Sequence, residues 1–92
     1  MPVQGYGTVD GLNWYFRARW NAWSFEVWRE PFGPKGQLPD PDSLWGTGGD
    51  YGTEPCAASH MPLTEAWERV EQSIAKGRAA NWVMPERDEG NL

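Results

Sequence analysis

A thiol and an imidazole are the two side chains of this sequence best suited to nucleophilic chemistry. Cys56 and His60 are the single Cys and the single His of the chain, and their spacing places two side chains on one face of a helix. A nucleophilic pair also needs a group that orients the base and a site that stabilises the oxyanion. The sequence shows neither, so we expect no enzymatic activity. One Cys and one His are also too few for a zinc site, and we expect no metal or other cofactor.

Acidic side chains gather in the middle of the chain, where they could bind a hard cation or a basic partner. These residues are Asp40, Asp42, Asp50 and Glu54. Their spacing does not follow the ligand pattern of an EF-hand loop, and the Gly-rich run 46–52 lacks the Lys of a phosphate-binding P-loop. We therefore predict that these carboxylates, with Glu65 and Glu68, contact Lys or Arg side chains of a protein partner. Trp45 and Tyr51 would anchor that contact, because surface charge contributes more to association rate than to affinity.

Aromatic and Arg side chains form a second candidate surface near the amino terminus. Apolar and polar residues alternate from Leu12 to Trp20, which predicts a strand with one buried face, and residues 23–28 alternate in the same way. Two-residue turns at Asp10–Gly11 and Asn21–Ala22 would join three such strands into a meander. The outward-facing side chains are then Tyr6, Tyr15, Arg17, Arg19 and Trp28.

The second of these turns predicts a particular register. A turn at Asn21–Ala22 places Arg17 opposite Glu26 and Tyr15 opposite Trp28. An opposite-charge pair and an aromatic pair would then lie on the outer face of the sheet. We expect these pairs to form the centre of the candidate surface.

The elements that position these groups make a small α+β domain. The spacing of apolar residues from Leu63 to Ile74 predicts one helix, with Thr64 as its N-cap. Gly77 either closes this helix or lies within a helix that continues to residue 80. We expect a three- to four-stranded antiparallel β-meander packed on this helix. Residues 1–85 would form a single domain, with an irregular Gly- and Pro-rich loop at 30–61 and a flexible polar tail at 86–92.

Length and charge limit the classes of partner. The chain has 92 residues, which is enough for one domain. Eight basic and thirteen acidic residues give a net charge of −5, which argues against unassisted binding to duplex DNA or to an anionic membrane surface. No signal peptide and no apolar stretch of membrane-spanning length is visible, so we expect a cytoplasmic protein without a membrane partner.

Three interpretations of the outward-facing aromatic row stay open. Phe32, Trp45 or Tyr51 from the long loop could cover the row, since large exposed apolar patches are uncommon. The row could bind a protein partner, because Tyr, Trp and Arg dominate the energetics of interfaces. It could also stack the bases of single-stranded nucleic acid beside Arg17 and Arg19, although the negative net charge disfavours direct nucleic-acid binding.

The run from Gly11 to Trp28, GLNWYFRARWNAWSFEVW, resembles a recurring pattern in small uncharacterised proteins of bacteriophages and prophages. In that pattern a strand ending in YFRAR, here Tyr15 to Arg19, leads into WSF, here Trp23 to Phe25, and a helix follows. Small acidic proteins of mobile elements are similar to the class that includes anti-CRISPR and other anti-defence inhibitors. The resemblance implies a protein of the bacterial host cytoplasm that covers a surface of a defence complex, often one that would otherwise receive nucleic acid.

Together these features predict a non-enzymatic inhibitor that binds a bacterial defence protein or complex through an acidic and aromatic surface. One alternative is a single-stranded nucleic-acid or nucleotide-binding module that uses the aromatic and Arg face of the sheet. Another is a phage structural or assembly protein. Self-association as a homodimer, through the sheet or its edge, is compatible with the protein-binding interpretations.

Overall fold

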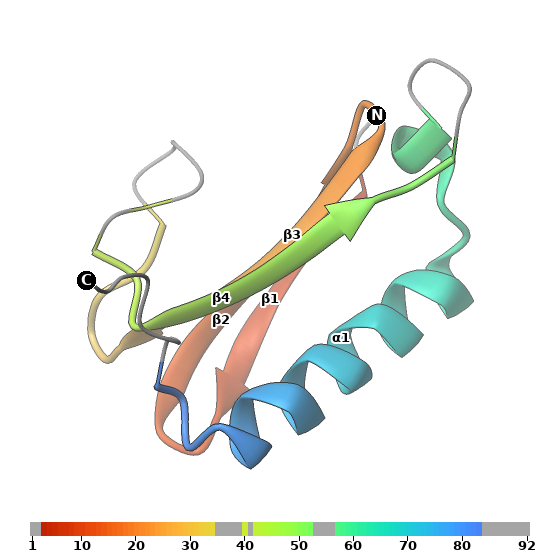
Figure 1. Cartoon of the computed structure of the whole chain (residues 1–92). Coiled ribbons are helices and arrows are strands. Elements are labelled where there is room, and N and C mark those ends of the chain that lie inside the picture. The colour runs from red at the N-terminus through yellow and green to blue at the C-terminus, as the bar shows by residue number, and fades with distance from the viewer. Residues whose placement is uncertain (1–2, 35–39, 41, 53–56, 84–92) are drawn as a thin grey trace, which may run out of the picture.

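The computed structural model describes residues 3–34, 40, 42–52 and 57–83, which form one sheet, a short 3-10 helix and one α-helix (Figure 1). Their bounds are β1 Val3–Val9, β2 Leu12–Arg19, β3 Ala22–Arg29, β4 Trp45–Asp50, η1 Ala57–His60 and α1 Leu63–Ala79. The strands are hydrogen-bonded in the order β1-β2-β3-β4, all antiparallel. Figure 1 shows α1 along one face of the sheet. The predicted α+β meander packed on one helix is therefore confirmed, whereas the predicted polar tail at 86–92 lies outside the described residues.

The first hairpin has the predicted turn and register. Asp10 and Gly11 adopt φ values of 53° and 75°, as a two-residue type I′ turn requires. Val9 therefore pairs with Leu12, and Gly7 pairs with Trp14. A Cβ atom on Gly7 would lie 3.0 Å from the Trp14 indole, so the absence of a side chain allows the large ring to lie across β1.

The second hairpin turns at Trp20 and Asn21 rather than at Asn21 and Ala22, with Trp20 at a φ of 59°. The predicted pairs of Arg17 with Glu26 and of Tyr15 with Trp28 are therefore wrong. The structure instead pairs Arg17 with Ser24, Tyr15 with Glu26 and Asn13 with Trp28.

The displacement of this register has a physical reason. In the predicted register Pro31 would lie opposite Leu12, where it has no N–H to donate to the sheet. In the structure Leu12 pairs with Arg29, and Pro31 follows the strand. Because the displacement is two residues, each side chain keeps its predicted face.

The fourth strand contains the Gly-rich run that resembles a phosphate loop in its glycines. Residues 45–50 pair with β3 along their whole length. A Cβ atom on Gly48 would lie 2.5 Å from the carbonyl oxygen of Trp23, so glycine permits the close approach of the two backbones. The run is therefore an edge strand and not a loop that could enclose a phosphate group.

The start of α1 differs from the predicted position, whereas its end agrees with one of the two predicted alternatives. The helix begins at Leu63 after Pro62, and no side chain caps it, so Thr64 is not the N-cap. It continues past Gly77 to Ala79, which is the longer of the two predicted helices. Asn81, with a φ of 54°, takes the left-handed position that follows the helix.

Aromatic rings fill the space between the sheet and α1. Trp14 stacks on Phe25 with ring centroids 5.7 Å apart, and Phe25 meets Trp45 edge-on at 6.3 Å. Trp45 in turn contacts Trp82 edge-on at 5.5 Å. These contacts make the helix-facing side of the sheet the core, so Trp14 and Phe16 point inward as predicted. The opposite face, which carries Tyr15, is left to interact with other partners.

Candidate functional site

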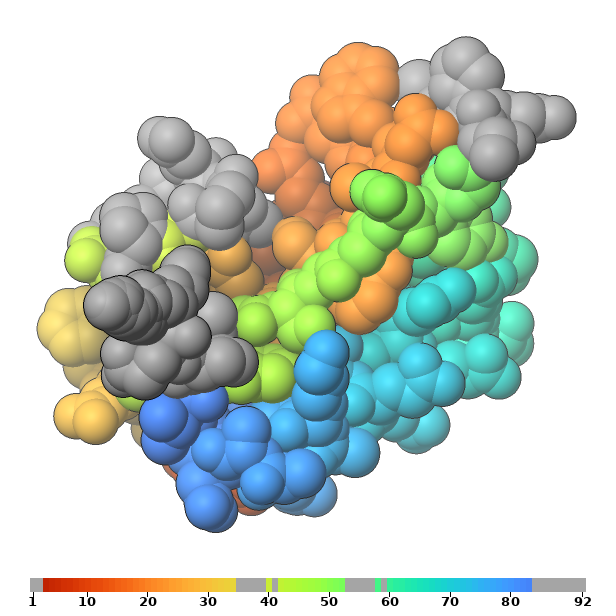
Figure 2. All heavy atoms as spheres, viewed as in Figure 1, coloured from red at the N-terminus to blue at the C-terminus, as the bar shows by residue number. Residues whose placement is uncertain are grey.

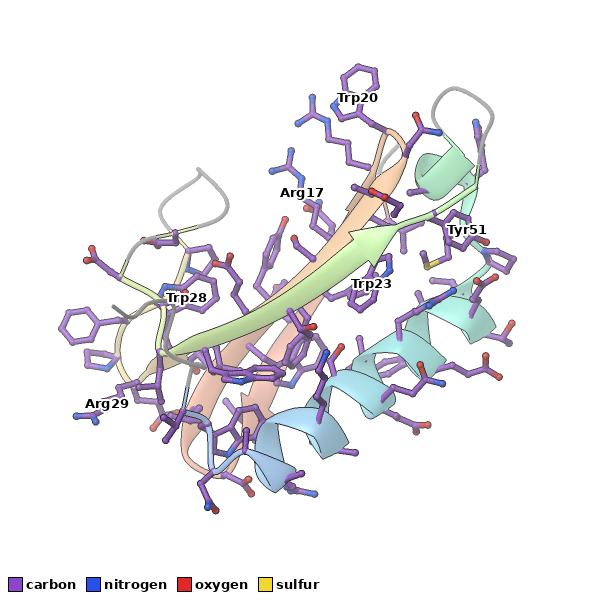
Figure 3. All side chains as sticks on the ribbon, viewed as in Figure 1. Arg17, Trp20, Trp23, Trp28, Arg29 and Tyr51 are labelled. Carbon is purple, nitrogen blue, oxygen red and sulfur yellow. The ribbon has the colours of Figure 1, made fainter. Side chains whose placement is uncertain are left out.

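Five exposed or half-exposed side chains on the outer face of β1 and β2 form the main candidate surface. We call this surface the aromatic/arginine patch: Tyr6, Tyr15, Arg17, Arg19 and Trp20. Tyr6 and Tyr15 are directly opposite each other in the sheet. Tyr6 is 83% exposed and Trp20 is 59% exposed. Figure 3 shows Arg17 on the side of the sheet away from α1 and Trp20 at the end of the β2–β3 hairpin.

Local contacts hold several members of the patch in place. The Tyr15 hydroxyl donates a hydrogen bond of 2.6 Å to the Gln4 side-chain oxygen. The Arg19 guanidinium lies 5.2 Å from the centre of the Trp20 ring, a cation–π distance. Among the described residues, neither Arg17 nor Arg19 forms an ion pair, and the Arg17 Nε is buried without a hydrogen-bond partner. The patch therefore presents positive charge and aromatic surface at the exterior of the sheet.

Trp28 lies on the same face but is not part of the exposed surface. It is completely buried, and its indole N–H donates a hydrogen bond of 3.2 Å to a carboxylate oxygen of Asp40. Asp40 lies between β3 and β4 in the sequence, so a residue that follows β3 covers one end of the outer face. The predicted cover by Phe32, Trp45 or Tyr51 is wrong, because Phe32 is 61% exposed and the other two lie on the helix side of the sheet.

The covered end also contains a buried carboxylate. Glu26 is 4% exposed, and its side-chain oxygen accepts a hydrogen bond of 3.1 Å from the backbone N–H of Asp40. Burial raises the pKa of Glu26, while the hydrogen bond from Asp40 opposes that rise. Asp40 and Glu26 therefore hold the covering segment on the sheet, and neither carboxylate is presented to a partner.

The acidic residues predicted to bind a partner are not brought together. Asp40 is buried near the carboxyl end of β3, where Leu44 bonds to Val27. Asp50 is exposed and pairs with Ala22 at the other end of the same strand. Asp42 is exposed near Asp40, whose carboxylate accepts a 2.8 Å hydrogen bond from the Asp42 backbone N–H. Glu54 lies outside the described residues. The structure therefore offers no joint acidic surface among the described members of this set.

Tyr51 and Glu65 take part in a contact between β4 and α1. The Tyr51 hydroxyl donates a hydrogen bond of 2.8 Å to Glu65, and Arg69 donates one of 3.1 Å to the other oxygen of Glu65. Arg69 also lies 5.6 Å from the ring centre of Trp23 and 5.7 Å from that of Tyr51. The hydrogen bond from Tyr51 lowers the pKa of Glu65, and the same bond raises the pKa of Tyr51. These groups stabilise the packing of α1 on the sheet, as does the buried Trp45.

The candidate catalytic and metal-binding groups do not form a site in the described chain. His60 is exposed at the end of η1, and Cys56 lies outside the described residues. In residues 3–34, 40, 42–52 and 57–83, no three His, Cys, Asp or Glu side chains come together as metal ligands would.

Two exposed features were not anticipated by the sequence analysis. The alternation of apolar and polar residues places Trp20 at the end of a strand, whereas in the structure Trp20 lies in the β2–β3 turn. The turn follows from the register of β2 and β3, which the alternation does not specify. The apolar spacing from Leu63 to Ile74 includes Leu63 and Trp67, but these two side chains are 70% and 57% exposed. On a helical wheel these two residues lie at the margin of the stripe formed by Ala66 and Val70, and that offset is a signal the spacing already contained.

Comparison with family models, with curated proteins and with solved structures found no match to this chain. Across the residues that the structure describes, no helix combines the length and the apolar character needed to cross a membrane.

Proposed function

We propose that this chain is a non-enzymatic protein of phage or mobile-element type that inhibits a bacterial defence complex by covering one of its surfaces. The observation that carries the proposal is the exposed aromatic/arginine patch. Tyr, Trp and Arg are the side chains that contribute most to binding energy at protein interfaces. In this patch they lie next to one another on a rigid antiparallel sheet, so little conformational entropy is lost when a partner binds.

The chemistry of the patch indicates what it would contact. Arg17 has a buried Nε without an acceptor, and Arg19 has no carboxylate partner in the described chain. A partner that supplies carboxylates or backbone carbonyls would pair with the guanidinium groups of Arg17 and Arg19. Tyr6 and Trp20 would bury apolar area beside them. The contact surface that the geometry favours is thus the patch rather than the acidic residues, since Asp40 is buried. Asp50 pairs with Ala22, which pairs with Arg19, so this carboxylate borders the patch at one end of the sheet.

The proposed inhibitory function can be tested by asking whether this chain protects a phage in cells that have an active defence system. The chain is expressed in bacteria that carry one defined CRISPR–Cas or other defence system, and the plating efficiency of a targeted phage is measured. We expect expression to raise plating efficiency at least tenfold in one such system. Replacing Trp20 with Ala, or Arg17 and Arg19 together with Ala, should abolish the effect without unfolding the protein.

Arg29 provides a matched control for these substitutions, because it is an exposed Arg outside the patch (Figure 3). Arg29→Ala should protect the phage as well as the wild type. If both patch variants protected the phage as well as the wild type does, the patch would not be the surface that contacts the partner. Absence of protection in every system of a broad panel would contradict the inhibitory function itself.

One observation favours a second candidate, a module that binds single-stranded nucleic acid. Tyr6 and Tyr15 lie side by side next to Arg17, an arrangement on which bases can stack. Trp28, which the sequence placed in the same row, is buried and cannot contribute. A titration with short oligonucleotides, followed by the intrinsic Trp fluorescence of the protein, separates the candidates. Salt-sensitive quenching at micromolar concentration would favour the second candidate, and no response at low salt would exclude it.

A further inference from the structure

The free edge of β1 exposes backbone groups that no described strand pairs. Val9 and Leu12 flank the two-residue turn and exchange both backbone hydrogen bonds. Alternate residues of an antiparallel strand direct their backbone groups to opposite sides. Gln4, Tyr6 and Thr8 therefore direct their N–H and C=O groups away from β2, and β1 has no second partner strand among the described residues.

Within the residues that the structure describes, this edge carries no charged residue, no proline and no added strand. Natural edge strands avoid further pairing through charged residues, proline, bulges or a covering element. The sequence of β1, VQGYGTV, contains no charged residue and no proline. The helix α1 contacts both edge strands, β1 and β4. At the β4 edge (Figure 2), however, the strand ends in the charged Asp50, and the Lys76 ammonium donates a hydrogen bond of 3.4 Å to Thr47. The two edges thus differ, and β1 is the one suited to pairing.

An apolar groove lies directly beside this edge. It has a volume of about 210 Å³ between β1 and α1, and its lining includes Gly5, Trp14, Leu63, Ala66, Trp67 and Val70. No charged residue lines it. The groove exists because Gly5 has no side chain to fill it and because Leu63 and Trp67 lie at its outer margin, 70% and 57% exposed. A strand added to β1 would direct every second side chain toward this groove.

We propose that β1 is a strand-addition site that binds an extended segment of the protein partner, with a large apolar side chain of that segment in the groove. The proposal rests on the proposed protein-binding function and names the class of segment that this part of the chain recognises. Main-chain hydrogen bonds to Gln4, Tyr6 and Thr8 would provide affinity, and the groove would select the side chain, as in other cases of β-strand addition. The uncharged lining requires an uncharged side chain, because a buried unpaired charge is costly.

A second copy of this chain fits the groove less well than a foreign segment does. The side chains of β1 that point toward α1 are those of Val3, Gly5, Gly7 and Val9. If two β1 strands paired around a central Tyr6, the partner's glycines would face the groove and leave it empty. A cavity of roughly 150 Å³ is already large enough for benzene, so the groove, at about 210 Å³, accommodates an aromatic or large aliphatic side chain.

Two substitutions block the site in different ways. Gly5→Leu fills the groove from β1 itself, and the space allows it, since a Cβ atom there would lie 3.9 Å from the nearest Trp14 atom. Tyr6→Pro removes an outward N–H group but none of the bonds between β1 and β2. Two controls match them: Thr8→Leu adds the same apolar side chain on the outer face, and Tyr6→Thr removes the same ring but keeps the N–H group.

The experiment selects binders from a displayed library of random peptides against the wild-type chain and measures the affinity of the synthesised peptides for each variant. We expect peptides with apolar residues at alternate positions. Gly5→Leu and Tyr6→Pro should each weaken their binding about tenfold or more, whereas Thr8→Leu and Tyr6→Thr should change it less than threefold. Circular dichroism of each variant shows whether the fold is retained.

Three outcomes would overturn the proposal. The first is that no peptide is enriched, and the second is that enriched peptides bind Gly5→Leu and Tyr6→Pro as tightly as the wild type. The third is a dimer in light scattering that Tyr6→Pro dissociates, which would make a second copy the occupant. Phage protection that depends on Trp20 and Arg17 but not on Gly5 would leave the proposed inhibitory function standing without this site.

Discussion

At the scale of single residues, the most unusual group is the carboxylate of Glu26. It lies beneath the segment that follows β3, is 4% exposed, and accepts its hydrogen bond from a backbone N–H rather than from a cationic side chain. Its nearest acidic neighbour is Asp40, whose charge also raises the pKa of Glu26. Among the residues that the structure describes, no cationic side chain pairs with this carboxylate, and burial without such a partner destabilises the fold when the group is ionised.

The pH dependence of stability follows from this shift. The folded protein holds the Glu26 proton more tightly than the unfolded chain does, because the pKa of Glu26 is raised above its usual 4.5. Stability therefore increases as pH falls through the raised pKa, and the gain is complete below about 4.5. Glu26→Gln keeps an oxygen that can accept from Asp40 but removes the charge. We expect this variant to be more stable than the wild type at pH 7, by a few degrees in Tm, since about 1 kcal/mol moves Tm by roughly 4–8 °C in a small domain.

Thermal unfolding of both proteins at pH 7 and at pH 4.5 measures this effect. The difference in Tm between variant and wild type should shrink at the lower pH, because Glu26 of the folded wild type is then mostly protonated. Glu68→Gln is the control, because Glu68 is an exposed carboxylate on α1 and should show no such difference. A Glu26→Gln variant that is less stable than the wild type at pH 7 would contradict the explanation.

At the scale of elements, the end of α1 determines how the chain returns to the sheet. The Trp82 N–H donates to the Gly77 carbonyl at 2.8 Å, and the Asn81 N–H donates to the Arg78 carbonyl at 3.0 Å. These bonds, with the left-handed Asn81, form a Schellman motif. The motif folds the Trp82 ring back onto Gly77, where a Cβ atom would overlap the ring. Gly77 is therefore inside the helix because of a packing contact and not because of its conformational freedom.

This contact predicts the sign of a substitution at Gly77. Alanine in a helix interior is usually more stable than glycine by about 0.5–1 kcal/mol. Overlap with Trp82 should cost more, about 1–3 kcal/mol, so we expect Gly77→Ala to destabilise the protein. In a Trp82→Ala background the same substitution should become stabilising. Urea unfolding of the two single variants and the double variant gives the coupling between them.

A control in the same helix calibrates this cycle. Ala75 is exposed, so Ala75→Gly measures the effect of helix propensity alone and should lower stability in both backgrounds equally. If Gly77→Ala stabilised the otherwise unchanged protein, the position of the Trp82 ring on the helix would be wrong.

The sequence predicted the faces of the strands better than their register. Alternation from Leu12 to Trp20 is a property of neighbouring residues, and it correctly placed Trp14 inward and Tyr15 outward. The position of the β2–β3 turn depends on which residue adopts a positive φ and on the exclusion of Pro31 from the sheet. The alternation of apolar and polar residues contains information about neither. A displacement of two residues preserves every face, so the candidate patch kept most of its members despite the different pairing.

The sequence could not predict which members of the row are covered. Burial of Trp28 depends on Asp40, twelve residues further along the chain, and on a hydrogen bond that spacing does not reveal. The closing residue of α1 is a similar case, since glycine was expected at a position that Asn81 takes. Both depend on contacts between distant segments, whereas the patterns used for prediction are local.

At the scale of the whole molecule, one ion pair connects the first turn of the sheet to the end of the helix. The Arg78 guanidinium donates two hydrogen bonds of 3.0 Å to the Asp10 carboxylate, and the Trp82 indole donates one of 3.1 Å to the same group. The hydrogen bond from Arg78 holds the pKa of Asp10 below its usual value, and that from Trp82 acts in the same direction. This turn ends β1, so the contact also fixes the end of the proposed strand-addition edge against α1.

Replacing Asp10 with Asn tests how much this contact contributes to stability. Asn tolerates the positive φ of the turn and can still accept from Trp82, but it removes the charge that Arg78 faces. We expect a modest fall in Tm at pH 7. Because the folded pKa is lowered, the contribution of Asp10 is fully present above its usual pKa of 3.8 and is lost as pH falls through the lower, folded value. The wild type should therefore approach the variant in strongly acidic solution, and also in high salt, which screens exposed charges. Asp50→Asn is the control, because Asp50 is an exposed carboxylate on β4. This variant should leave Tm nearly unchanged at every pH. If the difference in Tm between the Asp10 variant and the wild type stayed constant into acid, that result would contradict the role of this ion pair.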